Sequence, residues 1–211
     1  MGLLFTEDFL FIIPAEKISG FSKEIRPRHI QIFWESMIKR ERALRALRDA
    51  GCSEKVIQHC LTVESTALSI AGRITANGRS LNLGLISIGG LLHDIGRSKT
   101  HGVAHGVEGG RILRSMGLED LVRFAECHIG AGIPTDEAKK LGLPAKNFLP
   151  RSIEEKVVAY SDKLVFGDRV GAYEEVLANF KSDLGPRHPA IGRLARLHKE
   201  IHDLMGDKEA R

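Results

Sequence analysis

The chain has 211 residues, of which 43% are hydrophobic and 27% are charged, and its formal net charge is +4 at pH 7. This length is enough for one domain with a sizeable buried core. The small excess of positive charge suits a small anionic substrate and argues against nucleic acid as a partner. The three cysteines form no CxxC pair, so we expect a reducing, cytoplasmic location rather than a disulfide-stabilised secreted protein.

The apolar segment at the N-terminus is too short to cross a membrane. Residues 3–13 include Glu7 and Asp8, no basic residue precedes them, and the run stops at Pro14. These flanks do not fit a signal peptide either. We interpret the segment as a short strand or a docking element within an N-terminal extension, residues 1–36, and we expect no membrane association.

The rest of the chain carries mainly helical signals, and residues 37–211 are expected to form one helical domain. Ser53 is placed to cap a helix, Thr135 to cap a short one, and Ser152 with Glu155 forms a capping box. Alternating patterns typical of strands are scarce. The expected fold class is all-α, a compact multi-helix bundle, with helices over residues 30–50, 54–77, 83–94, 104–116, 119–128, 135–142, 152–165, 172–180 and 189–205.

The helix predicted over residues 83–94 is apolar nearly all round and ends in His93 and Asp94. Burying a carboxylate in apolar surroundings costs free energy unless a cation compensates it. An imidazole nitrogen beside a carboxylate oxygen suits a divalent transition metal. The pair therefore indicates one part of a metal site, provided that other segments supply further ligands.

Four other helices each carry a metal-capable side chain on the same face as their apolar residues. His59 lies four residues before Val63, and Asp162 lies four residues after Val158. Residues four apart share a helical face, so we expect these side chains to point toward the core. A single buried histidine is more often a hydrogen-bonded core residue. Six such groups in one helical domain instead favour a shared site formed by His59, His93, Asp94, His105, His128 and Asp162.

The order of these six residues resembles that of the HD-domain superfamily of metal-dependent phosphohydrolases. The sequence His93-Asp94-Ile95-Gly96 matches the HDIG variant of its motif. The resemblance covers about residues 43–169, and residues 130–150 are similar to a group of largely uncharacterised archaeal HDIG proteins. The segments that resemble the family's motifs are residues 56–59, 92–96, 105–110 and 158–164.

The resemblance implies a first metal position held by His59, His93, Asp94 and Asp162, and a second held by His105 and His128 with Asp94 as a bridge. His101, four residues before His105, is an alternative ligand or a substrate contact, but the glycines after His105 match the family. Ligands without cysteine argue against a structural zinc. They leave Fe, Mn, Co, Ni or Zn open, as one ion or two.

Three basic residues lie closest in sequence to these ligands. Arg97 offers a planar fork for a phosphate, whereas Lys99 and Lys163 offer point charges. The candidate substrate contacts are Arg97, Lys99 and His101. The candidate catalytic residues are Asp94, Arg97 and Lys163. The alternative interpretation of each of these three residues is an ordinary solvent-exposed basic side chain. For Lys99 this interpretation is at least as good as a functional one.

The expected function is hydrolysis of a phosphomonoester or phosphodiester, with a nucleotide as the expected substrate. The resemblance implies two adjacent cations that hold phosphate oxygens and generate a hydroxide for attack on phosphorus. Two alternatives stay open: a di-iron oxygenase with a similar ligand set, and a metal-binding regulatory module without turnover. A homo-oligomer is compatible with the sequence.

Three further features have structural interpretations. His198 and His202 have the spacing of a helical metal pair, but basic residues crowd them, so we predict a solvated basic face. Cys60 and Cys127 adjoin candidate ligands, yet neighbours on a helix point about 100° apart, so we predict core positions. The loop over residues 129–151 is interpreted as a lid or as a simple connection.

Overall fold

A computed structural model describes residues 28–207 of the chain, with side chains from residue 39 onward. The chain divides into two units, residues 1–35 and residues 36–211. Of the first unit, only the helical residues 28–35 are described. The strand or docking element predicted over residues 3–13 lies outside the described residues.

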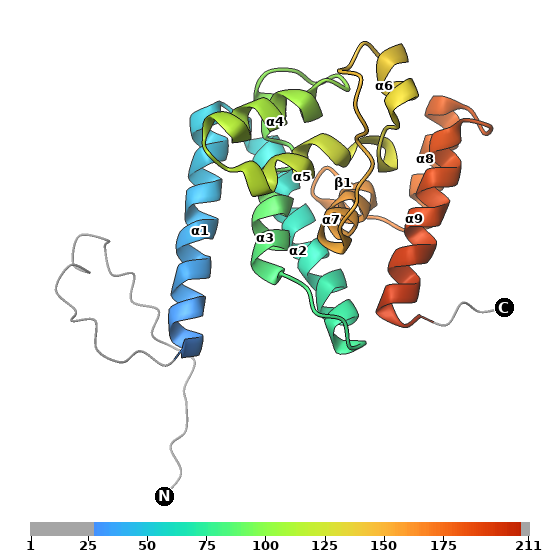
Figure 1. The fold of residues 1–211 in the computed structure, drawn as a ribbon. Helices are drawn as coiled ribbons and strands as arrows, with labels where there is room; N and C mark the ends of the chain where they lie inside the picture. Colours follow the sequence, from blue (N-terminus) through green and yellow to red (C-terminus); the bar gives the residue numbers. More distant parts are fainter. Residues whose placement is uncertain (1–27, 208–211) are drawn as a thin grey trace, which may run out of the picture. The chain divides into compact units, whose positions relative to one another are not determined.

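Helices dominate the described part of the chain (Figure 1), which confirms the all-α fold class. One short hairpin interrupts them: β1 and β2 pair antiparallel, with Val165 opposite Val170 and Phe166 opposite Arg169. Strands of two residues are too short to show alternation, so no pattern in the sequence indicated them. The elements are α1 (Arg28–Ala50), α2 (Glu54–Ala76), α3 (Leu83–Leu92), η2 (Ile95–Ser98), α4 (His105–Ser115), η3 (Glu119–Leu121), α5 (Val122–Cys127), η4 (Ile129–Ala131), α6 (Thr135–Lys140), α7 (Ile153–Leu164), β1 (Val165–Phe166), β2 (Arg169–Val170), α8 (Tyr173–Leu184) and α9 (Pro189–Met205).

Some helix ends follow the predicted caps and others do not. α2 begins after Ser53, whose Oγ accepts a hydrogen bond from the backbone N–H of Val56 at 3.4 Å. α9 spans the predicted residues. Pro134 rather than Thr135 is the N-cap of α6, and α8 continues to Leu184 instead of ending at residue 180.

α3 ends at Leu92, earlier than predicted. His93 is its C-cap, and Asp94 leaves the helix with φ −102° and ψ 12°. The chain then turns through η2, where Gly96 lies directly against the start of α4. A Cβ at Gly96 would lie 1.9 Å from the carbonyl oxygen of His105, so only glycine permits this approach. The turn brings His93 and Asp94 beside His105.

The core lies between the helices of the second unit. α2 packs against α3 and α7, while α4 packs against α5 and η2 (Figure 1). Cys60 and Cys127 are buried, as predicted. None of the helices within residues 28–207 has the length and apolarity needed to cross a membrane. The largest fully buried apolar side chains include Leu47, Ile57, Ile74, Ile86, Leu91, Leu113 and Ile201.

The loop over residues 129–151 is packed against the rest of the domain. Phe148 is only 1% exposed, and its backbone N–H donates to the carbonyl of Ile133 at 2.9 Å. Arg193 of α9 donates to Glu137 of α6 at 2.8 Å, and its side chain is 9% exposed. Of the two interpretations of this loop, these contacts favour a simple connection between helices over a lid.

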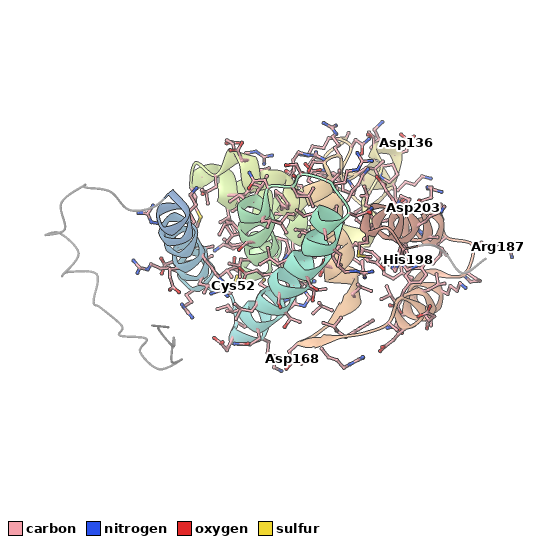
Figure 2. The ribbon with its side chains drawn as sticks, turned by 90° about the horizontal axis from the view of Figure 1, so that it is seen from below. Cys52, Asp136, Asp168, Arg187, His198 and Asp203 are labelled. Atoms are coloured by element: carbon pink, nitrogen blue, oxygen red, sulfur yellow. The ribbon has the colours of Figure 1, made fainter. Side chains whose placement is uncertain are left out.

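The histidine pair on α9 is not a solvated basic face, so this prediction was wrong. The Tyr160 hydroxyl lies 2.6 Å from Nδ1 of His198 and 3.5 Å from Nε2 of His202. Tyr173 of α8 stacks on His198, labelled in Figure 2, with ring centroids 3.6 Å apart. The hydrogen bond from Tyr160 to His198 joins residues 38 apart in sequence, which helical spacing does not reveal. The pair therefore packs α9 against α7 and α8.

Candidate metal centre

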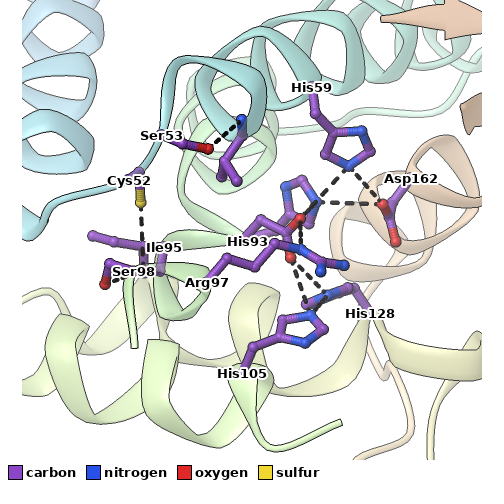
Figure 3. Close-up of polar contacts among 12 residues, drawn as sticks. Cys52, Ser53, His59, His93, Ile95, Arg97, Ser98, His105, His128 and Asp162 are labelled. Atoms are coloured by element: carbon purple, nitrogen blue, oxygen red, sulfur yellow. Dashed lines mark hydrogen bonds and ion pairs between the residues drawn. The ribbon is translucent and has the colours of Figure 1, made fainter. Parts of the chain in front are cut away.

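Six metal-capable side chains meet in the interior of the domain, and Figure 3 shows the convergence of the five that it labels, His59, His93, His105, His128 and Asp162. They are the six residues of the predicted ligand set. His93 and Asp94 are 0% and 1% exposed, so water does not solvate them. The side chains come from α2 (His59), the end of α3 (His93 and Asp94), the start of α4 (His105), the end of α5 (His128) and α7 (Asp162).

Backbone carbonyl groups orient all four histidine rings. In each ring Nδ1 lies near a carbonyl oxygen, at 2.7 Å for His93 and His105, 3.1 Å for His59 and 3.3 Å for His128. A carbonyl oxygen only accepts, so Nδ1 donates and a neutral ring presents its Nε2 lone pair to the cluster. The carbonyl at His59 belongs to Gly167 in the β1–β2 turn. This orientation by an outer partner is typical of metal-binding histidines.

One group of ligand atoms surrounds Oδ2 of Asp94. Nε2 of His59 lies 3.7 Å from this oxygen, and Nε2 of His93 lies 3.8 Å from it. Both nitrogens also face Oδ1 of Asp162, at 3.0 Å for His59 and 3.4 Å for His93. Two imidazoles and two carboxylates thus converge on one point.

A second group surrounds the other oxygen of Asp94. Nε2 of His105 lies 3.0 Å from Oδ1 of Asp94, and Nε2 of His128 lies 3.4 Å from it. The two Nε2 atoms are 2.9 Å apart. Two lone pairs facing each other at this distance repel unless a proton or a metal ion lies between them. The two oxygens of Asp94 therefore face different pairs of histidines.

The donor set fits divalent transition metals. Metal–ligand bonds of about 2.0–2.2 Å place neighbouring ligand atoms roughly 2.8–3.6 Å apart. Five of the seven separations given above are 2.9–3.4 Å, and the two to Oδ2 of Asp94 are slightly longer, at 3.7 and 3.8 Å. Nε2 of His93 and Oδ1 of Asp94 are buried without a hydrogen-bond partner in the described part of the chain, which is costly unless a cation binds them. The groups able to hold an ion include His59 with His93 and Asp94, and Asp94 with His105 and His128.

The surroundings keep both carboxylates charged. Burial raises the pKa of Asp94, but its electrostatic interactions with His93, His105 and His128 outweigh burial and hold the pKa well below its usual value. The same balance holds for Asp162, where the charge of Lys163 is the strongest opposing cause and the pKa is again well below usual. Burial lowers the pKa of His128 to about 4, so this ring is neutral at pH 7 and able to bind a metal.

The basic residues predicted near the ligands lie in different surroundings. Nε of Arg97 lies 2.5 Å from Oδ2 of Asp94, and the arginine side chain reaches into the histidine cluster (Figure 3). Nζ of Lys163 lies 2.6 Å from Oδ2 of Asp162, the oxygen that does not face the histidines. Lys99 is exposed. Arg97 therefore pairs with the central carboxylate, Lys163 pairs with the outer oxygen of Asp162, and Lys99 is exposed to solvent.

A cavity of about 290 Å³ opens beside the cluster. His101 belongs to its wall, whereas Lys99 and Lys163 do not. Lys55 also belongs to the wall, and the sequence prediction missed it. It lies four residues before His59, a spacing that places two side chains on one helical face, and this was the available signal. The lining consists of Lys55, Val56, His59, Asp94, Arg97, His101 and Gly167.

Comparison with known proteins identifies the family. Residues 56–167 match the family model of the HD domain, and this range contains all six converging side chains. The chain belongs to the HD domain family. As an HD-domain protein it is a member of a superfamily of metal-dependent hydrolases. Its buried cluster of histidines and aspartates is compatible with divalent metal binding.

Three relatives place this HD-domain protein among archaeal sequences. An uncharacterised protein of Methanocaldococcus jannaschii is 46% identical over 166 residues, which are 78% of this chain and 98% of that protein. This confirms the similarity to an uncharacterised archaeal group.

Two tRNA (cytidine(56)-2'-O)-methyltransferases also match, from Picrophilus torridus with 36% identity over 167 residues and from Thermoplasma volcanium with 40% over 157 residues. The matches cover 79% and 74% of this chain, but only 47% and 44% of the two methyltransferases. No solved structure gives a significant match.

Proposed function

We propose that this HD-domain protein is a metal-dependent phosphohydrolase that acts on a phosphomonoester or a phosphodiester. The observation that carries the proposal is the division of buried histidines between the two oxygens of Asp94, beside a cavity lined by Lys55 and Arg97. A carboxylate that bridges two cations next to a basic cavity suits hydrolysis of an anionic ester.

The buried cluster would hold two ions. Divalent transition metals there supply Lewis acidity toward phosphate oxygens and a nucleophile from water at neutral pH. Histidine-rich ligands suit Fe, Mn, Co, Ni or Zn. The first position would use His59, His93, Asp94 and Asp162, and the second would use Asp94, His105 and His128.

Arg97 is proposed as the residue that contacts the reacting phosphate. Its Nε donates to Asp94, and its two terminal nitrogens have no hydrogen-bond partner among residues 39–207. They are available to donate to phosphate oxygens, where negative charge accumulates during attack on phosphorus. Lys163 acts instead as a positioning residue, because it pairs with the outer oxygen of Asp162.

The charge of the cavity favours this function over the two alternatives. A di-iron oxygenase acting on an uncharged organic substrate has no use for Lys55 and Arg97 in the cavity wall. A regulatory module without turnover needs no open cavity beside its ligands. The free cysteines in the described part of the chain support action in a reducing, cytoplasmic compartment.

The names of the relatives bear on the substrate. Two of them are named for an activity on tRNA, which supports a nucleotide-derived phosphate ester. The same names count against the prediction that excluded nucleic acid as a partner, so tRNA and short RNAs belong in any substrate panel. We do not extend methyl transfer to this chain, because it spans less than half of those proteins.

Removing the metals is expected to abolish hydrolysis. Elemental analysis of the full-length protein should find up to two transition-metal ions per chain. A panel of nucleotides, phosphodiesters and RNAs, assayed for released phosphate or alcohol, should then contain at least one substrate. Chelation should reduce turnover to background, and adding back the same metal should restore it. Full turnover by the chelated protein would contradict the proposal.

A further inference from the structure

The cavity beside the ligands carries more basic than acidic side chains. Its wall carries Lys55 and Arg97, the imidazole of His101, and a single carboxylate, Asp94. Arg97 donates a hydrogen bond to one oxygen of that carboxylate, Oδ2. The lining contains no phenylalanine, tyrosine or tryptophan on which a base would stack. Such a cavity binds its ligand through negative charge rather than through an aromatic ring.

Arg97 and Lys55 serve different parts of this cavity. Nε of Arg97 is held 2.5 Å from Asp94, so its terminal nitrogens stay beside the ligand cluster. Lys55 lies on α2 one helical turn before the ligand His59, about 6 Å away along the helix axis. Its side chain therefore joins the cavity wall one helical turn from the ligand, and its ammonium group is carried on a flexible stem.

Lys55 lies where its charge has no partner among the described side chains. It is the second residue of α2, at the positive end of the helix dipole, where a cation is disfavoured. Its neighbour Glu54 accepts a hydrogen bond from Gln58 at 2.8 Å. Within residues 39–207 no carboxylate forms an ion pair with Lys55. An anion in the cavity would supply the missing partner.

The buried side of the same cavity also points to a ligand. Asp94 lines the cavity and is 1% exposed, and its Oδ1 lacks a hydrogen-bond partner in the described chain. The cavity thus has one end that needs cations and another end that needs an anion. Metal ions held at the first end would bind one phosphate of a ligand, and Lys55 would then lack an anion unless the ligand carried a second phosphate.

We propose that Lys55, together with His101, forms a second anion subsite, and that the substrate carries a second phosphate beside the one that is hydrolysed. The chemical class is a bisphosphorylated compound bound through its phosphates, with any base outside the cavity. This inference rests on the proposed phosphohydrolase function, because that function assigns the first phosphate to the ligand cluster.

Non-hydrolysable phosphonates test the subsite without turnover. Isothermal titration of the metal-loaded, full-length protein would compare propylphosphonate with the diphosphonates of ethane, propane and butane. We expect the best diphosphonate to bind at least about tenfold more tightly than propylphosphonate, as one added charge-assisted contact implies. Equal affinity across the series, or binding of neither class, would overturn the inference.

Two variants locate the effect. Lys55→Gln should reduce the preference for the diphosphonate to less than about twofold while leaving the affinity for propylphosphonate unchanged. The matched variant Lys181→Gln, at an exposed position of α8 outside the cavity lining, should keep the full preference. A Lys55→Gln protein that loses affinity for both ligands equally would show general attraction instead of a subsite.

The two proposals fail in different ways. If the phosphonate preference is present and depends on Lys55, but no ester in the panel is hydrolysed, the subsite stands and the phosphohydrolase function falls. If esters are hydrolysed but the preference is absent, the function stands and the subsite falls.

Discussion

Replacing Asp94 with asparagine is expected to lower kcat/KM by at least about a thousandfold, or roughly 4 kcal/mol of transition-state stabilisation. Each oxygen of Asp94 faces a different pair of histidines, so under the proposed function this one carboxylate would contribute to both metal positions. An amide has no negative charge, and its NH₂ group cannot bind a cation. Since changes to outer-sphere partners already cost about 10–100-fold in metal affinity or activity, loss of a bridging ligand should cost more.

The measurement is the metal content together with kcat/KM of the purified variant. Asp168→Asn is the matched control, because it makes the same chemical change at an exposed position in the β1–β2 turn (Figure 2). It should retain both ions and wild-type activity. An Asp94→Asn protein with a full metal complement and more than about a tenth of the activity would rule out a bridging role.

Replacing Gly96 with alanine is expected to destabilise the domain by about 3 kcal/mol or more. The new Cβ would lie 1.9 Å from the carbonyl oxygen of His105 and 2.4 Å from the backbone nitrogen of Gly109. Both atoms belong to the backbone, so no side-chain rotation relieves the clash. η2 must separate from α4, which moves Asp94 away from His105. We therefore expect reduced metal content as well as a lower free energy of unfolding in urea.

The matched control is the same substitution elsewhere. Gly72 lies in α2 and is exposed, and a Cβ at this position would have no neighbouring atom within 4 Å. Gly72→Ala should raise the free energy of unfolding by about 0.5–1 kcal/mol, because alanine is the better helix former. If Gly96→Ala were as stable as Gly72→Ala, the close approach of η2 to α4 would be wrong.

Local spacing in the sequence predicted the helical fold and the inward faces of the candidate ligands, and the resemblance to the HD domain grouped the six side chains into metal positions. Helical periodicity places His59 and Asp162 on apolar faces, and a cap such as Ser53 fixes a helix start through a contact three residues away. These signals are contained in short windows of the chain. They can therefore be recognised without knowledge of the tertiary structure.

The features that were missed depend on contacts between distant segments. The end of α3 is set by the approach of Gly96 to α4, and the ring of His59 is oriented by the carbonyl of Gly167, 108 residues away. The hydrogen bond between Tyr160 of α7 and His198 of α9 likewise joins two distant helices. Lys55 is an exposed lysine like many others, and its spacing from His59 gains meaning only once the cavity beside it is seen.

Hydrolysis in ¹⁸O-labelled water tests the proposed chemistry at the atom where it occurs. The metal-loaded protein, given a nucleoside phosphate identified in the panel, should place one ¹⁸O atom in each released phosphate and none in the alcohol, because water attacks phosphorus. The Asp94→Asn protein should give only the background rate. Label in the alcohol, or oxygen consumption without phosphate release, would contradict a phosphohydrolase built around Asp94.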